Sequence, residues 1–137
     1  MQFSYINPTQ IEFGQGKIEK ISELISKEEK VLVLYGGGSI KKNGVYDQIK
    51  SALEDFTWFE FGGIEPNPKK ETLDKAIAYG RENNVDFVLA VGGGSVIDDT
   101  KVIEKVTTLL EKHGFTHFGD RETIDKAVVV KILEKSI

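Results

Sequence analysis

Residues 88–101, VLAVGGGSVIDDTK, lead four apolar residues into three glycines and a serine, after which a helix is predicted to begin. Residues 31–40, VLVLYGGGSI, repeat this arrangement earlier in the chain. A third run of mainly apolar residues, TWFEF, lies at 57–61. Such runs, alternating with helical patterns, are typical of parallel strands in a sheet that is covered on both faces. The sequence therefore predicts an α/β fold with strands at about 31–35, 57–61 and 86–91.

The remaining segments predict how these strands are connected. Crossovers between parallel strands are right-handed, and we expect the strand order 2-1-3. This order places the ends of the first and third strands side by side. Residues 3–6 and 11–14 flank an Asn-Pro turn and predict a hairpin or an extended pair at the N-terminus. Helical spacing of apolar residues is found at 17–26, 43–55, 70–84, 96–114 and 120–136.

Composition excludes several classes of function. The 137 residues are enough for one domain, and a net charge of −4 with scattered basic residues argues against a nucleic-acid partner. The absence of cysteine excludes disulfides and thiolate metal sites, and it fits a cytoplasmic location. The first residues do not resemble a signal peptide, and no run reaches the roughly 20 apolar residues of a membrane span.

The two glycine turns predict an anion site. A strand that ends in Gly-Gly-Gly-Ser and enters a helix exposes several backbone N–H groups to a ligand. The helix dipole adds partial positive charge, and the serine can cap the helix and bind a phosphate oxygen. One such turn is equally well explained as a tight turn, but two at neighbouring strand ends favour phosphate or nucleotide binding. Neither turn has the G-x-G-x-x-G spacing or the lysine of a P-loop.

Candidate catalytic residues are few. His113 and His117 are the only histidines, and the Gly114 between them favours a solvated loop over a metal site. Asp98 and Asp99 are explained by the first turn of a helix, where the dipole favours carboxylates. Trp58, within an apolar strand, is interpreted as a core residue. The sequence therefore predicts neither a catalytic group nor a metal ligand.

Four stretches resemble a known family. They are PTQIEFGQGKI (8–18), VLVLYGGGSIKKNGVYDQI (31–49), FEFGGIEPNPKKETL (59–73) and AVGGGSVIDDTK (90–101). In family order, they resemble the iron-containing (group III metal-dependent) alcohol dehydrogenases, in particular the branch of butanol dehydrogenases and NADPH-dependent aldehyde reductases. The resemblance implies a Rossmann-like parallel sheet of about three strands with helices on both faces, plus the N-terminal extended pair.

The tail resembles another part of the same family. Residues 109–136 are similar to the family's extreme C-terminus, although members run to several hundred residues. The resemblance thus implies one truncated dinucleotide-binding domain over 1–137. Within it, 1–103 is the N-terminal cofactor domain and 104–137 is a helical tail joined after an internal deletion. The family's metal ligands, an aspartate and three histidines, match no position here, so the divalent metal (Fe or Zn) is not expected to bind.

The resemblance also implies cofactor contacts. An NAD site usually places a carboxylate on the ribose 2′-hydroxyl, and the turn YGGGSIKK has none. Its serine and two lysines could instead meet a 2′-phosphate, so NADP(H) is predicted over NAD(H). By family analogy, the pyrophosphate lies at Gly93, Gly94 and Ser95, the adenosine ribose at Gly36, Gly37 and Ser39, and Asn67 of the EPNP motif also touches the cofactor.

Three functions remain open from the sequence. The first is an NADP(H)-binding domain of a metal-dependent alcohol or aldehyde oxidoreductase, without catalytic activity as this chain. The second is an oxidoreductase that is active only with a partner supplying the metal domain. The third is a structural or assembly fragment without activity. Because a parallel sheet that lacks its later strands has an apolar edge, we also expect a homo-oligomer, through strand 86–91 or the N-terminal extended segments.

Overall fold

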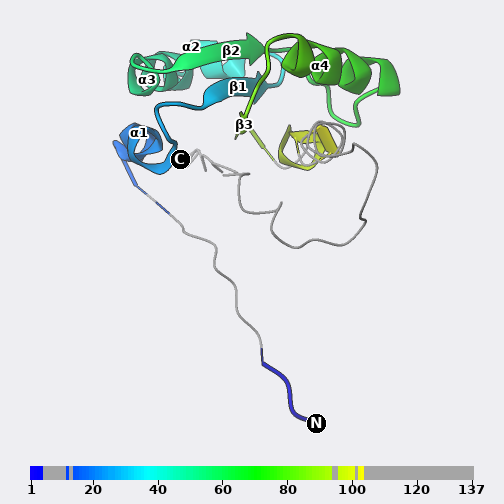
Figure 1. The fold of residues 1–137 in the computed structure, drawn as a ribbon, viewed down its shortest axis with the longest axis horizontal. Helices are drawn as coiled ribbons and strands as arrows, with labels where there is room; N and C mark the ends of the chain where they lie inside the picture. The colour runs from blue at the N-terminus through cyan, green and yellow to red at the C-terminus, as the bar shows by residue number, and fades with distance from the viewer. Residues whose placement is uncertain (5–11, 13, 94–95, 101, 104–137) are drawn as a thin grey trace.

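A three-stranded parallel sheet forms the centre of the chain (Figure 1). The computed structural model describes residues 1–4, 12, 14–93, 96–100 and 102–103. The strands are β1 (Lys30–Tyr35), β2 (Thr57–Phe61) and β3 (Phe87–Val91), in the order β2-β1-β3. Both the predicted strands and the predicted order 2-1-3 are confirmed.

Asp86 sets the register of β3 against β1. Its backbone N–H donates to the Lys30 carbonyl at 3.0 Å, and its carboxylate Oδ2 accepts the Lys30 N–H at 3.1 Å. From this start, Val31 pairs with Phe87 and Tyr35 with Val91. Since parallel strands keep their register along their whole length, β1 and β3 end side by side.

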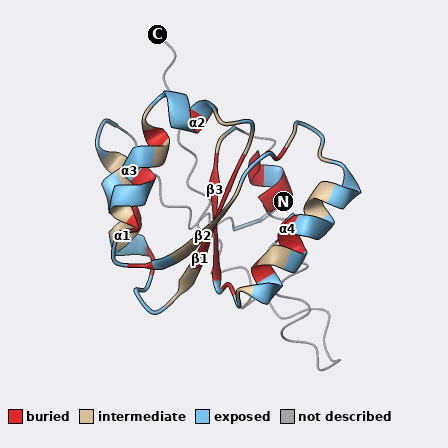
Figure 2. Cartoon of the chain, turned by 90° about the horizontal axis from the view of Figure 1, so that it is seen from above, coloured by how far each residue is buried: buried red, intermediate tan, exposed pale blue. Residues whose placement is uncertain are grey.

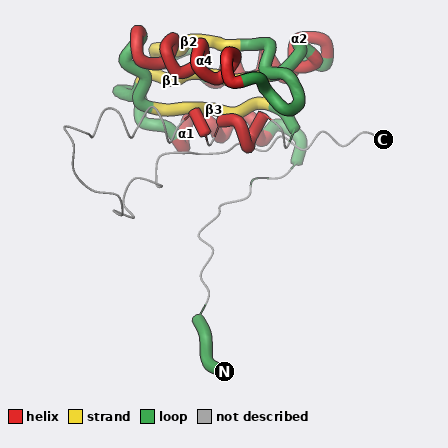
Figure 3. Tube along the Cα trace, turned by 90° about the vertical axis from the view of Figure 1, so that its right-hand side faces the viewer, coloured by secondary structure: helices red, strands yellow, loops and turns green. Residues whose placement is uncertain are grey.

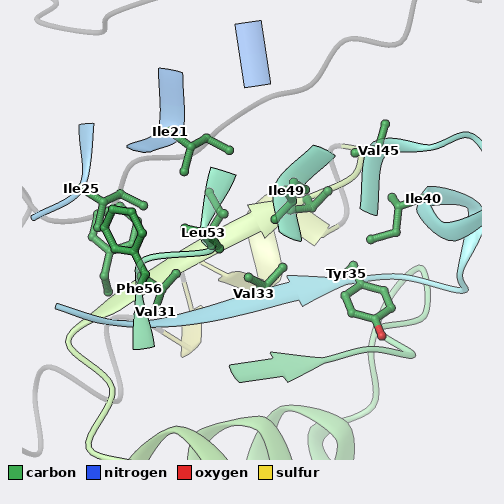
Figure 4. Close-up of a cluster of buried hydrophobic side chains, with 13 residues drawn as sticks. Ile21, Ile25, Val31, Val33, Tyr35, Ile40, Val45, Ile49, Leu53 and Phe56 are labelled. Carbon is green, nitrogen blue, oxygen red and sulfur yellow. The ribbon is translucent and has the colours of Figure 1, made fainter. Parts of the chain in front are cut away.

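Helices cover both faces of the sheet (Figures 2 and 3). On one face lie the 3₁₀ turn η1 (Lys17–Lys20), α1 (Ile21–Leu24) and α3 (Val45–Ala52). Figure 4 shows how their apolar side chains meet Val31 and Val33 of the sheet. The buried side chains of this layer include Ile21, Ile25, Ile49, Leu53 and Phe56.

The opposite face packs against α4 (Lys70–Glu82). Leu32 and Leu34 of β1 are buried there with Ala76 and Ile77 of α4. Burying a leucine side chain contributes roughly 1.5–3 kcal/mol, so the alternation of β1 side chains stabilises both layers at once. The prediction of a sheet covered by helices on both faces is therefore confirmed.

The helix α4 ends in a hydrogen-bonded turn that delivers the chain into β3. Asn84 has a φ of 51°, in the left-handed region that asparagine tolerates. Its N–H donates to the Arg81 carbonyl at 3.1 Å, and the N–H of buried Val85 donates to the Gly80 carbonyl at 3.0 Å. This pair of bonds is the Schellman motif, and it explains why the helix is shorter than the predicted 70–84.

Two other predicted helices are also shorter in the structure. The 17–26 helix is only η1 followed by one turn of α1, because Ile25 is already extended at φ −109° and ψ 136°. The 43–55 helix is limited to α3. The helix expected directly after the first glycine turn is a separate short helix, α2 (Ser39–Lys42), which precedes α3. Gly44, with a φ of 82°, separates α2 from α3 because this backbone conformation ends a right-handed helix.

Part of the predicted structure lies outside the described residues. Residues 96–100 and 102–103 are helical, which agrees with the start of the predicted helix at 96–114. We call them the post-β3 helix. The remainder of that helix, the helix at 120–136 and most of the N-terminal hairpin are outside the described residues. Among the residues that are described, no helix is long and apolar enough to cross a membrane.

Replacing Gly80 by alanine is expected to stabilise the chain. A Cβ at Gly80 would lie 3.5 Å from Leu32 Cδ2, an ordinary van der Waals contact, and alanine favours a helix interior over glycine by about 1 kcal/mol. Urea unfolding of Gly80→Ala should therefore show a gain of roughly 0.5–1 kcal/mol.

The matched control is Ala78→Gly, at an exposed position of the same helix. It should cost about 1 kcal/mol through the same difference in helix propensity. A loss of stability in Gly80→Ala would mean that α4 and β1 cannot accommodate the added methyl group.

Candidate functional site

The two glycine turns lie next to each other at one edge of the sheet. Gly36 follows Tyr35 at the end of β1, and Gly92 follows Val91 at the end of β3. Tyr35 and Val91 are paired in the register of the sheet. The predicted juxtaposition of the two turns is therefore confirmed. The turns lie at the carboxyl ends of adjacent parallel strands, which is where open α/β sheets bind ligands.

The first glycine of each turn has a packing role. A Cβ at Gly36 would lie 3.2 Å from the Ile64 carbonyl oxygen and 3.6 Å from Val96 Cγ2. At Gly92, which has a φ of 151°, a Cβ would lie 3.0 Å from the same Val96 methyl. Both turns therefore lie close to Val96 of the post-β3 helix. Side chains at these two positions would push the segments apart.

The following glycines are open. A Cβ at Gly37, Gly38 or Gly93 would meet no heavy atom within 4 Å, and Gly37 and Gly93 are exposed. Their backbones can thus be approached by a ligand without any side chain in between. Packing therefore does not require glycine at these positions. Glycines that stay open in this way are expected in a ligand cradle rather than in a turn that is merely tight.

Ser39 does not cap the helix that follows the first turn. Gly38, with a φ of 96°, is the N-cap of α2, and no side-chain hydrogen bond caps that helix. Ser39 is instead the first residue of α2, and it is exposed. The predicted serine cap is wrong for this turn, because the left-handed glycine takes its place. With only four residues, α2 also supplies less dipole than the full helix that was predicted.

The loop that follows β2 borders the first turn. The Gly63 N–H donates to the Gly36 carbonyl at 3.0 Å, and the Ile64 N–H donates to the Tyr35 carbonyl at 3.2 Å. Further along the loop, the exposed Asn67 has a φ of 55°, which local backbone geometry by itself explains for asparagine. The structure thus places Asn67 in the loop beside the first turn.

The predicted site residues are partly brought together. Gly36, Gly37, Ser39 and Gly93 belong to the two turns at the same sheet edge. Gly94 and Ser95 lie outside the described residues, so their assignment stays a prediction.

Asp99 is a buried carboxylate that the sequence explained differently. We expected Asp98 and Asp99 to be stabilised by a helix N-terminus. Asp98 is exposed, but Asp99 is only 8% exposed and its Oδ2 has no hydrogen-bond partner among the described residues. Burial raises the pKa of Asp99, and the carboxylates of Asp98 and Glu65 raise it further. Burial therefore opposes ionisation of Asp99, so a position in the first turn of a helix does not by itself explain this carboxylate.

Glu65 ties the loop after β2 to its own following helix. Both of its carboxylate oxygens lie 3.3 Å from Thr72 Oγ1 of α4. Its own backbone N–H is the main cause that lowers the pKa of Glu65, with the Lys69 N–H and the Thr72 hydroxyl adding to it. Since Glu65 also raises the pKa of Asp99, the loop is close to the post-β3 helix as well as to the first turn.

The sequence analysis missed a charged pair near the first turn. Lys41 Nζ of α2 lies 3.8 Å from Glu60 Oε1 of β2. Glu60 is one residue from the end of β2 and about 20 residues beyond the glycine turn, where dinucleotide folds place an acidic residue. This spacing was the available signal.

A metal centre is not formed by the part of the chain that the structure describes. There, no group of three or more histidine, cysteine or carboxylate side chains is placed to hold a metal ion. His113 and His117 lie outside the described residues.

Gly36→Ala and Gly37→Ala are expected to separate packing from ligand access. At Gly36 the added methyl group meets the carbonyl oxygen of Ile64. This carbonyl cannot move freely, because the Ile64 N–H is hydrogen-bonded to the Tyr35 carbonyl. Gly36→Ala should therefore destabilise the chain by roughly 1–3 kcal/mol in urea unfolding. Gly37→Ala, in open space, should change stability by less than about 1 kcal/mol. Equal losses in both variants would contradict the distinction.

Asp99→Asn is expected to stabilise the chain at pH 7. Because the pKa of Asp99 is raised in the folded chain, folding is favoured by the protonated form and loses this contribution as pH rises through the folded pKa. The gain at pH 7 should be about 1 kcal/mol and should disappear as the pH falls below the ordinary aspartate pKa of about 3.9, where the carboxyl is protonated in the folded and the unfolded chain.

The comparison requires unfolding curves of both proteins at each pH. The exposed Asp74→Asn on α4 serves as the control, since it makes the same change without burial. A gain that is constant with pH, or equal in the control, would rule out a buried ionised carboxylate as the cause.

Comparison with known proteins identifies the family. The sequence profile of the iron-containing alcohol dehydrogenases matches residues 8–132. NADH-dependent butanol dehydrogenase A of Clostridium acetobutylicum is 51% identical over 106 residues, which are 75% of this chain and 27% of that protein. NADPH-dependent aldehyde reductase YqhD of Escherichia coli is 54% identical over 101 residues, 74% of this chain and 26% of that protein.

Solved structures agree with the sequence comparison. The substrate- and cofactor-free form of E. coli aldehyde reductase YqhD matches with a TM-score of 0.76 and 49% identity, over 82% of this chain and 30% of that one. NADH-dependent butanol dehydrogenase A from Thermotoga maritima matches with a TM-score of 0.70 and 47% identity, over 75% of this chain and 27% of that one. The chain spans about a quarter of the length of these relatives, and it belongs to the iron-containing alcohol dehydrogenase family.

Proposed function

We propose that this chain is the NADP(H)-binding domain of an alcohol or aldehyde oxidoreductase. The observation that carries the proposal is the pair of open glycine turns at the ends of β1 and β3. Gly37 and Gly93 leave backbone N–H groups accessible, and pyrophosphate is an anion that such groups bind well. The names of the relatives, which are dehydrogenases and reductases dependent on NADH or NADPH, support a nicotinamide cofactor.

The preference for NADP(H) rests on the first turn. Ser39 is exposed at the start of α2, and Lys41 and Lys42 follow in the same short helix. A serine hydroxyl and two ammonium groups favour a 2′-phosphate over a neutral ribose hydroxyl. The relatives include both NADH-dependent and NADPH-dependent proteins, so the preference is a property to be measured on this chain.

We further propose that this chain alone binds the cofactor without carrying out redox chemistry. A bound nicotinamide supplies the hydride in such reactions, while the protein must hold and polarise the alcohol or aldehyde. The described residues bring together no metal-ligating group that could do so. The family's activity is therefore assigned to proteins that also contain the region beyond the quarter matched here.

Self-association in the cytoplasm is the remaining part of the proposal. Among the described strands, β3 pairs only with β1, so no described strand occupies its second edge. Such an edge, in a strand made of apolar residues, favours pairing with a second copy of the chain. The absence of cysteine suits a reducing compartment.

Titration with NADPH and NADH tests the cofactor proposal. Saturable binding that is tighter for NADPH and unaffected by a metal chelator is expected by calorimetry. Gly37→Ala and Gly93→Ala, whose new methyl groups would occupy the open side of each turn, should each weaken binding about tenfold. An absence of binding at millimolar cofactor would refute the proposal and leave the turns with a packing role only.

A further inference from the structure

Lys41 is held by three side chains at the first glycine turn. Its Nζ lies 4.7 Å from the centre of the Tyr46 ring and 5.4 Å from that of Tyr35. These distances are within the range of cation–π attraction. Glu60 Oε1 lies 3.8 Å from the same ammonium group. The lysine that follows the turn is therefore drawn back over two aromatic rings and towards β2.

The other oxygen of Glu60 is enclosed. Glu60 Oε2 is inaccessible to solvent and has no hydrogen-bond partner within the described part of the chain. Interaction of the Glu60 carboxylate with the Tyr46 hydroxyl is the main cause that raises the pKa of Tyr46. A carboxylate in this position depends on Lys41 as its counter-charge, since a buried acceptor without a partner carries a desolvation cost.

The aromatic side chains are themselves fixed in place. The Tyr46 ring is edge-on to Tyr35, with centroids 6.3 Å apart, and edge-on to Trp58, with centroids 6.5 Å apart. A Cβ at Gly62 would lie 2.5 Å from the Tyr35 ring, so a glycine is required beside it. Lys41 thus rests on a packed surface that continues into the core.

We propose that Glu60 is a positioning residue that limits the preference for NADPH by holding Lys41 back from the 2′-phosphate. This inference rests on the proposed cofactor function. Lys41 lies two residues beyond Ser39 and is the first basic residue in the sequence after the turn. While Glu60 neutralises this charge, the turn attracts the added phosphate less strongly. Removing the Glu60 charge frees Lys41 for the phosphate and leaves binding of NADH unchanged.

Glu60→Gln tests the proposal through the ratio of the dissociation constants for NADH and NADPH. The variant should raise this ratio about threefold to fivefold, the scale of a half-exposed ion pair. The effect should largely disappear in a Lys41→Met background and persist in a Lys42→Met background. Glu60→Asp, which keeps the charge, should return the ratio towards that of the wild type.

Glu54→Gln is the control for a general change of charge. Glu54 is exposed and precedes the start of β2, whereas Glu60 lies near the end of that strand. Glu54→Gln should therefore leave the ratio of the two dissociation constants unchanged. If Glu60→Gln fails to fold, Lys41→Met alone still tests the proposal. Because Lys41→Met leaves the Glu60 carboxylate without its counter-charge, this variant should lower the ratio. An unchanged ratio would overturn the inference.

The outcomes separate the inference from the function on which it rests. Wild-type chain that binds neither dinucleotide would refute the proposed function and the inference together. Wild-type binding with an equal effect of Glu60→Gln on both cofactors would overturn only the role of Glu60. Fluorescence of Trp58, the single tryptophan, shows whether the variants preserve the packing beneath Lys41.

Discussion

The arrangement of the site depends on the contact of Val96 with the first glycines of both turns. Because Gly36 and Gly92 lack side chains, β1, β3 and the post-β3 helix meet within van der Waals distance of one valine. The loop after β2 joins the same point, since its backbone is hydrogen-bonded to Tyr35 and Gly36. Larger residues at either glycine would separate these segments, so close packing at the strand ends is the condition for an organised turn.

Packing and ligand access are thereby assigned to different glycines of the same motif. The first glycine of each turn is surrounded by the protein, whereas the next faces open space. This separation explains why a run of glycines occurs where a single one would satisfy the backbone. It also means that loss of stability and loss of ligand binding can be caused by substitutions at adjacent positions.

The charges around the turns are balanced locally. Glu60 and the two tyrosine rings hold Lys41 beside the first turn. Asp99 of the post-β3 helix is buried, and its Oδ2 has no hydrogen-bond partner in the part of the chain that the structure describes. Both carboxylates are partly desolvated, but only Glu60 has a cation within ion-pair distance among the described residues. The cationic character of the first turn is therefore set by residues of β2 and α3 as well as by the turn itself.

The strands and the glycine turns follow from the sequence alone, because continuous apolar runs and glycine clusters are local patterns. The strand order 2-1-3 was an expectation that the structure confirms. The family resemblance, carried by the turns and the EPNP motif, is also confirmed. Only the tertiary structure decided that Gly38 replaces Ser39 as the helix cap, that Asp99 is buried and that Glu60 reaches Lys41. Each of these depends on contacts or burial between segments, or on a backbone conformation set where segments meet, and no local pattern in the sequence specifies them.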